Sequence, residues 1–180
     1  MAEEKRRLVE RILDVSYLED LAQRSIEDIK TMRDECRATE TELSFERRLC
    51  QARVEILRAE LERRAHGGDE DQLLSRLPQI LATEPGRPEV PLPARAPDFS
   101  VPRSADVPRR RVEEIVGEQT IARLPKLSVD EVKSVTANLE QYEKTVSSRR
   151  RQVQQVLDAV QEEIVRRYKS GEADPTAALG

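Results

Sequence analysis

The sequence predicts an all-α protein built on an antiparallel two-helix coiled coil, a long helical hairpin with a short N-terminal helix and a Pro-rich, largely irregular linker. Two long stretches carry apolar residues at alternating spacings of four and three, the heptad pattern of a narrow helical seam. Charged residues make up 37% of the 180-residue chain and aromatic residues 3%, a balance that suits exposed helices sharing a narrow seam. Most of the prolines lie between the two stretches, where they rule out a continuous helix.

The N-terminal part, residues 1–66, holds a short amphipathic helix over 2–14 and the first long helix. A new helix start is expected at Ser16, because Ser16 and Glu19 have the spacing of a capping box. The seam falters at Glu46 and Arg47 and ends at Gly67, a normal C-terminal stop. About fifty residues of helix would span roughly 75 Å. Its seam positions are Leu18, Ala22, Ser25, Ile29, Met32, Cys36, Thr39, Leu43, Cys50, Val54, Leu57 and Leu61.

The linker covers residues 67–127. Its density of proline favours an extended, solvated tether, with short helices expected at about 70–82 and 111–124. A linker of this length can reach in either direction, so reach alone does not exclude a parallel pairing of the two long helices.

The second long helix is predicted over residues 128–172, followed by a tail at 173–180. It opens at Ser128 with Glu131 three residues on, a second capping-box pair, and Gly171 ends it. Its seam positions are Val132, Val135, Leu139, Tyr142, Val146, Arg149, Val153, Val156 and Val160.

One polar pattern, E-x3-S-x2-R-x3-Q-x3-[DE], occurs once on each long helix, with a constant offset of 103 residues. Its intervals follow helical turns, so each copy lies on one face, beside the apolar seam. The repeat extends to Arg48, Glu60, Arg63 and Arg64, which recur as Arg151, Glu163, Arg166 and Arg167. The first copy is Glu40, Ser44, Arg47, Gln51 and Glu55, and the second is Glu143, Ser147, Arg150, Gln154 and Asp158.

Two functions fit such a face. Flanking salt bridges steady any coiled coil, which would make the chain a structural adaptor or dimerisation module with no nucleotide ligand. However, the repeated cation is always Arg, and Ser and Gln recur in register although they add little to ion pairing. Arg grips phosphate or a guanine edge, and a carboxylate can accept hydrogen bonds from guanine nitrogens. The chemistry therefore suits a guanine nucleotide.

Other classes are disfavoured. A net charge of −4, a pI near 5.4 and five aromatic residues argue against a nonspecific nucleic-acid binder, which would release DNA steeply with salt. We expect no enzyme and no metal site, because His66 is the only histidine and no phosphate-cradling Gly loop occurs. Cys36 and Cys50 lie roughly 21 Å apart along one helix, too far for a disulfide.

A reduced, cytoplasmic setting is expected. The residues from Met1 to Lys5 do not resemble a signal peptide. No apolar run approaches the ~20 residues that a membrane-spanning helix needs.

The doubled motif resembles the signature of the RsiG family of actinobacterial anti-sigma factors. The resemblance covers both long helices, including the stretch Glu46–Leu61 and the end Arg166–Glu172, but not the linker. It implies two molecules of cyclic di-GMP as ligands, one on each motif copy, with Arg48 and Arg151 as possible additional contacts. Glu55 departs from the family pattern, which ends in Asp.

The same resemblance implies the partner, a WhiG-type sigma factor of the flagellar or sporulation class that is kept from RNA polymerase. Family members with one motif would pair as homodimers. Because this chain has both motifs, it is expected to act as a monomer in a 1:1 complex, with no direct DNA or RNA binding and no membrane contact. The nucleotide would act as a molecular glue between the two proteins.

Overall fold

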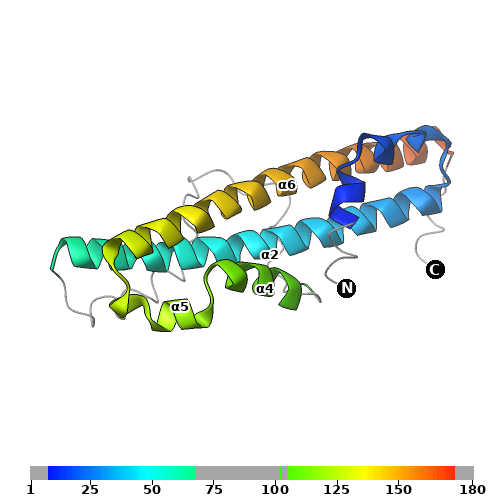
Figure 1. Ribbon diagram of the computed structural model, residues 1–180. Helices are drawn as coiled ribbons and strands as arrows, with labels where there is room; N and C mark the ends of the chain where they lie inside the picture. The colour runs from blue at the N-terminus through cyan, green and yellow to red at the C-terminus, as the bar shows by residue number, and fades with distance from the viewer. Residues whose placement is uncertain (1–7, 68–101, 103–104, 173–180) are drawn as a thin grey trace. The chain divides into compact units, whose positions relative to one another are not determined.

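The structure, a computed structural model, describes residues 8–67, 102 and 105–172, and all regular structure in these ranges is helical (Figure 1). This agrees with the predicted all-α fold, in which two long helices pack together. The predicted helix at 70–82 and most of the linker lie outside the described residues. The elements in order are a helical turn at residues 8–12, the 3-10 helices η1 (Val15–Leu18) and η2 (Leu21–Gln23), α2 (Ile26–Ala65), α4 (Asp106–Ile115), α5 (Glu118–Ala122), η3 (Leu124–Lys126) and α6 (Val129–Ser170).

The chain divides into two compact units, each made from segments far apart in the sequence. Unit 1 comprises Met1–Leu43 and Ser148–Gly180, and unit 2 comprises Ser44–Ser147. The first half of α2 and the second half of α6 belong to unit 1, and the other two halves belong to unit 2. Within each unit, rising residue numbers on α2 meet falling numbers on α6, so the antiparallel pairing is confirmed. In unit 1 the contacts that show it are Arg167 with Arg24, just before α2, and Arg150 with Glu40. In unit 2 they are Glu143 with Gln51, and Arg64 with Leu127, just before α6.

Both long helices begin with a side-chain cap. The Ser128 hydroxyl accepts a hydrogen bond from the Glu131 backbone N–H at 3.2 Å, and the Glu131 carboxylate accepts one from the Ser128 N–H at 2.7 Å, which confirms the predicted capping box. The first long helix begins nine residues later than predicted, because its cap is Ser25 rather than Ser16. The Ser25 hydroxyl accepts a hydrogen bond from the Asp28 N–H at 3.1 Å.

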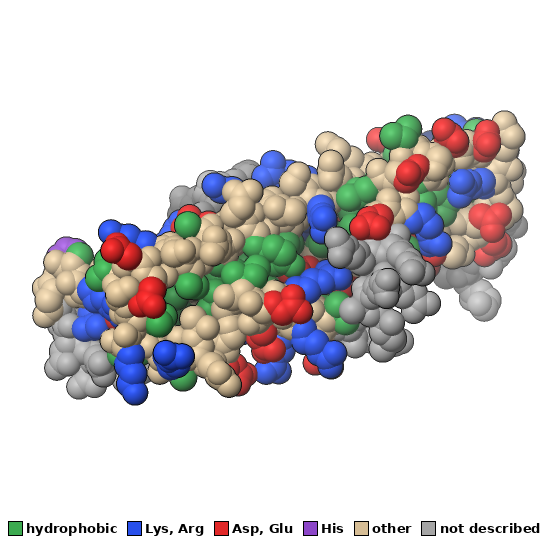
Figure 2. Space-filling view, viewed as in Figure 1, with side chains coloured by type: hydrophobic (Ala, Val, Ile, Leu, Met, Phe, Trp, Pro, Cys, Tyr) green, Lys and Arg blue, Asp and Glu red, His purple; other side chains and the backbone are tan. Residues whose placement is uncertain are grey.

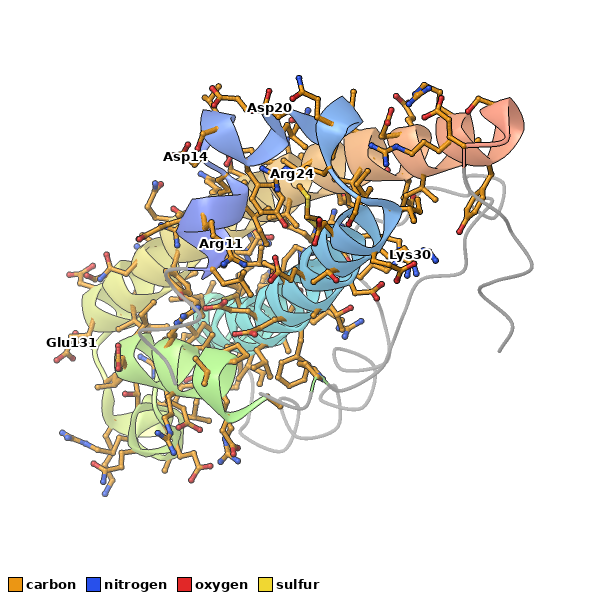
Figure 3. All side chains as sticks on the ribbon, turned by 90° about the vertical axis from the view of Figure 1, so that its right-hand side faces the viewer. Arg11, Asp14, Asp20, Arg24, Lys30 and Glu131 are labelled. Carbon is orange, nitrogen blue, oxygen red and sulfur yellow. The ribbon has the colours of Figure 1, made fainter. Side chains whose placement is uncertain are left out.

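The predicted start at Ser16 was wrong. Asp14 caps a 3-10 turn there, accepting hydrogen bonds from both the Ser16 N–H and its hydroxyl. Figure 3 shows Asp14 on this turn and Glu131 at the start of α6. Because Ser25 and Ser128 are 103 residues apart, the offset of the polar motif also relates the two true caps.

The apolar seam is buried in both units, largely at the predicted heptad positions. In unit 1 the buried residues include Ile12, Tyr17, Ile29, Met32, Cys36, Val153, Val160 and Ile164. In unit 2 the core cluster consists of Cys50, Val54, Leu57, Val112, Val116, Leu124, Val132 and Leu139. Arg149 was predicted as a seam residue and is exposed instead, because a cation without a buried partner is strongly disfavoured in a core.

The C-terminal ends of α2 and α6 are held by equivalent arginine contacts. Arg64 donates to the backbone carbonyls of Leu127 and Leu124 at 2.5 and 2.6 Å, beside the start of α6. Arg167 donates to the carbonyls of Arg24 and Leu21 at 2.6 and 3.0 Å, beside the start of α2. In each case a carboxylate four residues earlier orients the guanidinium, and the two carboxylates are Glu60 and Glu163.

The predicted helix at 111–124 is found as two shorter helices with a break at Val116 and Gly117. The first of these, α4, starts earlier than predicted and contains Pro108 in its first turn. Proline is compatible with that position, because the first backbone N–H groups of a helix have no intrahelical acceptor. Within unit 2, α4 packs its apolar face against α2 through Val112 and Val116.

Among the described residues, no helix has the length and apolar character required to span a membrane. The charged composition accounts for this, since Lys, Arg, Asp and Glu side chains are spread over the outer surface in Figure 2.

Candidate functional site

The ten motif residues are grouped by unit rather than by motif copy. Unit 1 contains Glu40 from the first copy together with Arg150, Gln154 and Asp158 from the second. Unit 2 contains the remaining six, which are Ser44, Arg47, Gln51, Glu55, Glu143 and Ser147. Each unit therefore brings residues of both copies together across the pair of helices.

In unit 1, two motif side chains of α6 converge on one carboxylate of α2. Arg150 Nη1 lies 3.2 Å from Glu40 Oε1, and Gln154 Nε2 donates to the same oxygen at 3.3 Å. The side chains of Arg150 and Glu40 are 23% and 20% exposed. The Nε atom of Arg150 is buried and has no hydrogen-bond partner among the residues that the structure describes. A buried, unsatisfied guanidinium N–H costs free energy.

In unit 2, the same pairing occurs with the helices exchanged. Gln51 Nε2 on α2 donates to Glu143 Oε1 on α6 at 3.1 Å, and the Ser147 hydroxyl donates to that oxygen at 2.8 Å. The Glu of each copy thus accepts a hydrogen bond from the Gln of the other copy. The sequence placed these residues on a common face of each helix, but it could not show that the carboxylate and the amide pair between helices.

These contacts define what the face can do chemically. Each unit presents a half-buried carboxylate beside an amide and, in unit 1, beside a guanidinium. A carboxylate is an acceptor only, whereas an amide both donates and accepts and a guanidinium only donates. Such a set can bind the edge of a planar, hydrogen-bonding ring and an adjacent anionic group.

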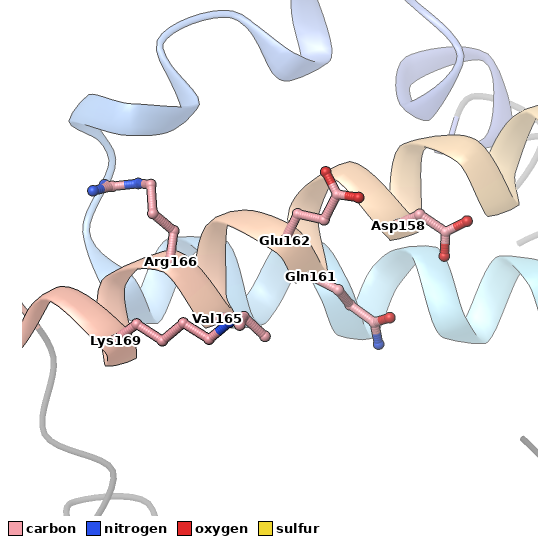
Figure 4. Close-up of a pocket in the computed structure, with 6 residues that line it drawn as sticks. All are labelled: Asp158, Gln161, Glu162, Val165, Arg166 and Lys169. Carbon is pink, nitrogen blue, oxygen red and sulfur yellow. The ribbon is translucent and has the colours of Figure 1, made fainter. Parts of the chain in front are cut away.

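Four motif positions lie outside these two hydrogen-bonded clusters. Ser44 and Arg47 are half-buried on α2, and the other two are the last positions of the two copies. Asp158 is exposed and lines a shallow surface hollow on α6 with Gln161, Glu162, Val165, Arg166 and Lys169 (Figure 4). Glu55 forms an ion pair with Arg58 within α2, at 3.6 Å. The last position of the second copy, Asp158, is therefore open to solvent. The last position of the first copy, Glu55, is paired within its own helix. Of the possible additional contacts, Arg151 is exposed and Arg48 is half-buried.

A buried polar cluster in unit 2 was not predicted. Glu46 is 1% exposed, accepts a short hydrogen bond from the Tyr142 hydroxyl, and lies 3.5 Å from Arg111 Nη1 of α4. Burial, reinforced by Glu46, raises the pKa of Tyr142. The sequence signal was the interruption of the seam at Glu46, which we interpreted as a fault in the heptad pattern. A carboxylate at a seam position indicates instead that a basic partner packs over it.

Both cysteines, Cys36 and Cys50, are buried. Burial raises the pKa of the Cys50 thiol to about 12 and also raises that of Cys36, so neither thiol ionises readily near neutral pH. His66 is exposed at the end of α2, where its Nδ1 contacts the Glu62 carbonyl. In the part of the chain that the structure describes, no cluster of His, Cys, Asp and Glu could hold a metal ion.

A helical scaffold that presents the same polar face twice, beside a narrow apolar seam, defines a coiled-coil binding protein. A search of curated proteins found no match. The RsiG-like family model matches residues 15–81 and 118–179. The chain therefore belongs to the RsiG-like family, which is an anti-sigma-factor family and has a sigma factor as its partner at the family level. The two matched segments begin 103 residues apart, the offset that relates the two motif copies and the two caps.

Proposed function

We propose that this chain is an anti-sigma factor that binds cyclic di-GMP through its two motifs and, with the nucleotide bound, sequesters a WhiG-type sigma factor away from RNA polymerase. The observation that carries the proposal is the reciprocal pairing of motif residues, Glu40 with Gln154 and Glu143 with Gln51. Residues that only stabilised a coiled coil would not need a serine and an amide repeated in register on both helices.

Each motif residue type has a role that its chemistry allows. Glu40 and Glu143 would accept hydrogen bonds from the ring and exocyclic nitrogens of guanine, because a carboxylate can accept two of them side by side. Arg150 and Arg47 would bind phosphate or a guanine edge. Ser44, Ser147, Gln51 and Gln154 would bind phosphate or ribose oxygens. Asp158 and Glu55 would close the site, and Arg48 and Arg151 would add positive charge.

The charge balance makes the ligand dependent on nearby arginines. Two cyclic di-GMP molecules carry four phosphate charges, and the chain already has a net charge of −4. The motif arginines must therefore offset a local excess of negative charge. The guanidinium of Arg150, whose side chain is 23% exposed, is suited to a phosphate or guanine oxygen.

Cooperation with the sigma factor follows from the shape and the resting contacts of the face. A stripe on two helices cannot bury a ligand as a concave pocket does, so the other side of the nucleotide would be covered by the sigma factor. The ligand must also replace the hydrogen bonds that the amides now give to Glu40 and Glu143. Both effects weaken binding to the lone chain. If the sigma factor covers the bound nucleotide and so strengthens its binding, linkage requires that the nucleotide strengthen binding of the sigma factor by the same factor.

The alternative function is a structural coiled-coil adaptor. It is favoured by the Arg58–Glu140 contact at 2.8 Å, which shows that this helix pair also uses ion pairs between helices at positions outside the motif. The two functions differ in what Arg150→Ala should do. In an adaptor it should cost only ~0.3–0.5 kcal/mol of stability, whereas in the nucleotide-gated protein it should abolish capture of the partner without unfolding the chain.

The decisive experiment is size-exclusion chromatography of the chain mixed with a WhiG-type sigma factor, with and without cyclic di-GMP. We expect a complex only with the nucleotide, and its loss in Arg150→Ala. Glu140→Ala is the matched control, because it removes an ion pair between α2 and α6, the one with Arg58, through a residue that lies outside the motif. A complex that forms regardless of the nucleotide, or that survives Arg150→Ala, would contradict the proposal.

A further inference from the structure

An internally repeated protein that binds one sigma factor must contact it, at least in part, through positions where its two repeats differ. The motif positions are nearly identical in both copies, so by themselves they cannot orient a single partner. A surface that orients the partner is therefore expected at exposed residues whose counterparts 103 positions away are of another chemical kind.

One such surface lies on α6 within unit 1, and we name it the outer patch. It consists of Ser148, Arg149, Gln152 and Gln155, all exposed. At about 100° per residue these four lie within roughly 60° of Gln152 around the helix axis. Arg149 itself lies roughly 100°, 140° and 180° around α6 from Arg150, Gln154 and Asp158. The outer patch therefore lies largely away from the motif face.

The counterparts of the outer patch belong to the packed surface of unit 2. Arg149 corresponds to Glu46, which is 1% exposed and bonded to Tyr142 and Arg111. Gln152 corresponds to Leu49, which packs against the apolar core cluster. The other two counterparts are Phe45 and Ala52. These positions are thus apolar or buried in the first repeat, and polar and exposed in the second.

The charge of the outer patch indicates the chemistry of its occupant. Residues 148–157 contain three arginines and no Asp or Glu. Arg149 forms no hydrogen bond or ion pair with another residue that the structure describes, whereas Arg150 is held by Glu40. In Figure 2 the middle of α6 is largely tan, the colour of uncharged polar side chains and backbone, with blue cationic groups beside it.

We propose that the outer patch is a docking surface for an acidic helix of the sigma factor. A carboxylate of that helix would meet Arg149, while Ser148, Gln152 and Gln155 offer short or flexible polar side chains that a second helix can pack against. This inference rests on the proposed function for the identity of the partner. It adds a contact that is separate from the nucleotide, so the sigma factor would be held both through the ligand and directly.

The test is a titration of labelled sigma factor with the full chain at saturating cyclic di-GMP. Arg149→Glu should weaken the complex about tenfold or more, because it sets two like charges against each other. Lys133→Glu is the matched control, since Lys133 is another exposed cation of α6 with no ion pair to a described residue, and it should change the affinity less than about twofold.

A pair of opposite substitutions separates docking from folding. Gln152→Glu and Gln152→Lys each place a long charged side chain at the same exposed position, so their effects on folding should be similar. Against an acidic helix, Gln152→Glu should weaken the complex about threefold or more and Gln152→Lys should strengthen it. Equal weakening by both would overturn the acidic partner.

The remaining outcomes distinguish this inference from the proposed function. If the wild-type chain forms the nucleotide-dependent complex and Arg149→Glu binds equally well, the inference fails and the proposed function stands. If the wild-type chain forms no complex with the sigma factor, both fail. A dimer of the chain alone that Arg149→Glu dissociates would assign the outer patch to a second copy and would also overturn the inference.

Discussion

The two units use the same contacts at their ends and at the motif, but they differ at one position of the seam. Each has a serine cap, a Glu–Arg pair that holds two backbone carbonyls, and a motif carboxylate that accepts a hydrogen bond from the amide of the other copy. At this seam position, unit 2 buries Glu46 against Arg111 and Tyr142, whereas unit 1 has Arg149 exposed. The shared contacts build the helical scaffold and the motif face. The difference between Glu46 and Arg149 gives each unit a distinct surface.

This comparison also separates two kinds of polar residue. A polar group that is buried must be satisfied, and removing its partner costs the full desolvation penalty. A polar group that is exposed costs little to remove and is free to take part in recognition. Glu46 and Arg149 stand at these two extremes although they occupy equivalent positions of the repeat.

The largest effect is expected at Glu46. Glu46→Ala leaves the Tyr142 hydroxyl and Arg111 without their acceptor in a buried site, and should lower the free energy of unfolding by about 3 kcal/mol. Arg149→Ala should change it by less than about 0.5 kcal/mol. Urea unfolding followed by circular dichroism measures both. Equal costs at the two positions would remove the distinction between a buried and an exposed member of the repeat.

The arginines at the helix ends should come next. Arg167 and Arg64 are 9% and 15% exposed and each donates to two carbonyls. Arg167→Ala and Arg64→Ala should each lower the free energy of unfolding by about 2 kcal/mol, because two part-buried acceptors lose a charged donor. Arg166→Ala is the control, since Arg166 bonds only to the carboxylates of Glu163 and Glu172 among the described residues. Clearly different losses in the free energy of unfolding for Arg167→Ala and Arg64→Ala would show that the two arginine contacts, although equivalent in the repeat, do not stabilise the protein equally.

Heptad spacing and helix caps made most of this fold predictable. Most seam positions and the Ser128–Glu131 cap followed from residue types at fixed spacing. The antiparallel pairing was the expectation, but spacing and linker length left a parallel one open, and the contacts between the helices decide it. The start of α2 was misplaced because Ser16 and Glu19 satisfy the same pattern as Ser25 and Asp28. Local spacing cannot choose between two such sites, whereas applying the 103-residue offset to Ser128 would have chosen Ser25.

The sequence predicted which residues form the site, but not which of them pair with one another. The motif identified the residues, because their spacing follows the turns of the helix. It did not give the exchange by which Glu40 meets Gln154, since that depends on the register between two helices far apart in the sequence. The cluster at Glu46 was missed for the same reason, because Arg111 comes from a short helix that no heptad pattern relates to α2.

The caps should have a smaller effect. Ser128→Ala removes the acceptor for the Glu131 N–H and should cost about 1 kcal/mol of unfolding free energy, and Ser25→Ala should cost a similar amount through Asp28. Ser16→Ala should cost less, because Asp14 caps that turn with its own carboxylate. A larger loss from Ser16→Ala than from Ser25→Ala would contradict the observed start of α2.

The smallest effect is the acid dependence of the carboxylate at the end of α6. Hydrogen bonds from Arg166 and then Arg167 lower the pKa of Glu163 to about 2, from an ordinary value of 4.5. Because the folded-state pKa is the lower one, the stabilisation is complete above about pH 4.5 and is lost as the pH falls towards 2. Its size should be about 0.5–1 kcal/mol, since solvent screens a pair near the surface. Urea unfolding of the wild type and Glu163→Gln should therefore differ most near neutral pH and converge in acid. A difference that stays constant down to about pH 2 would mean that Glu163 acts through packing rather than through its charge.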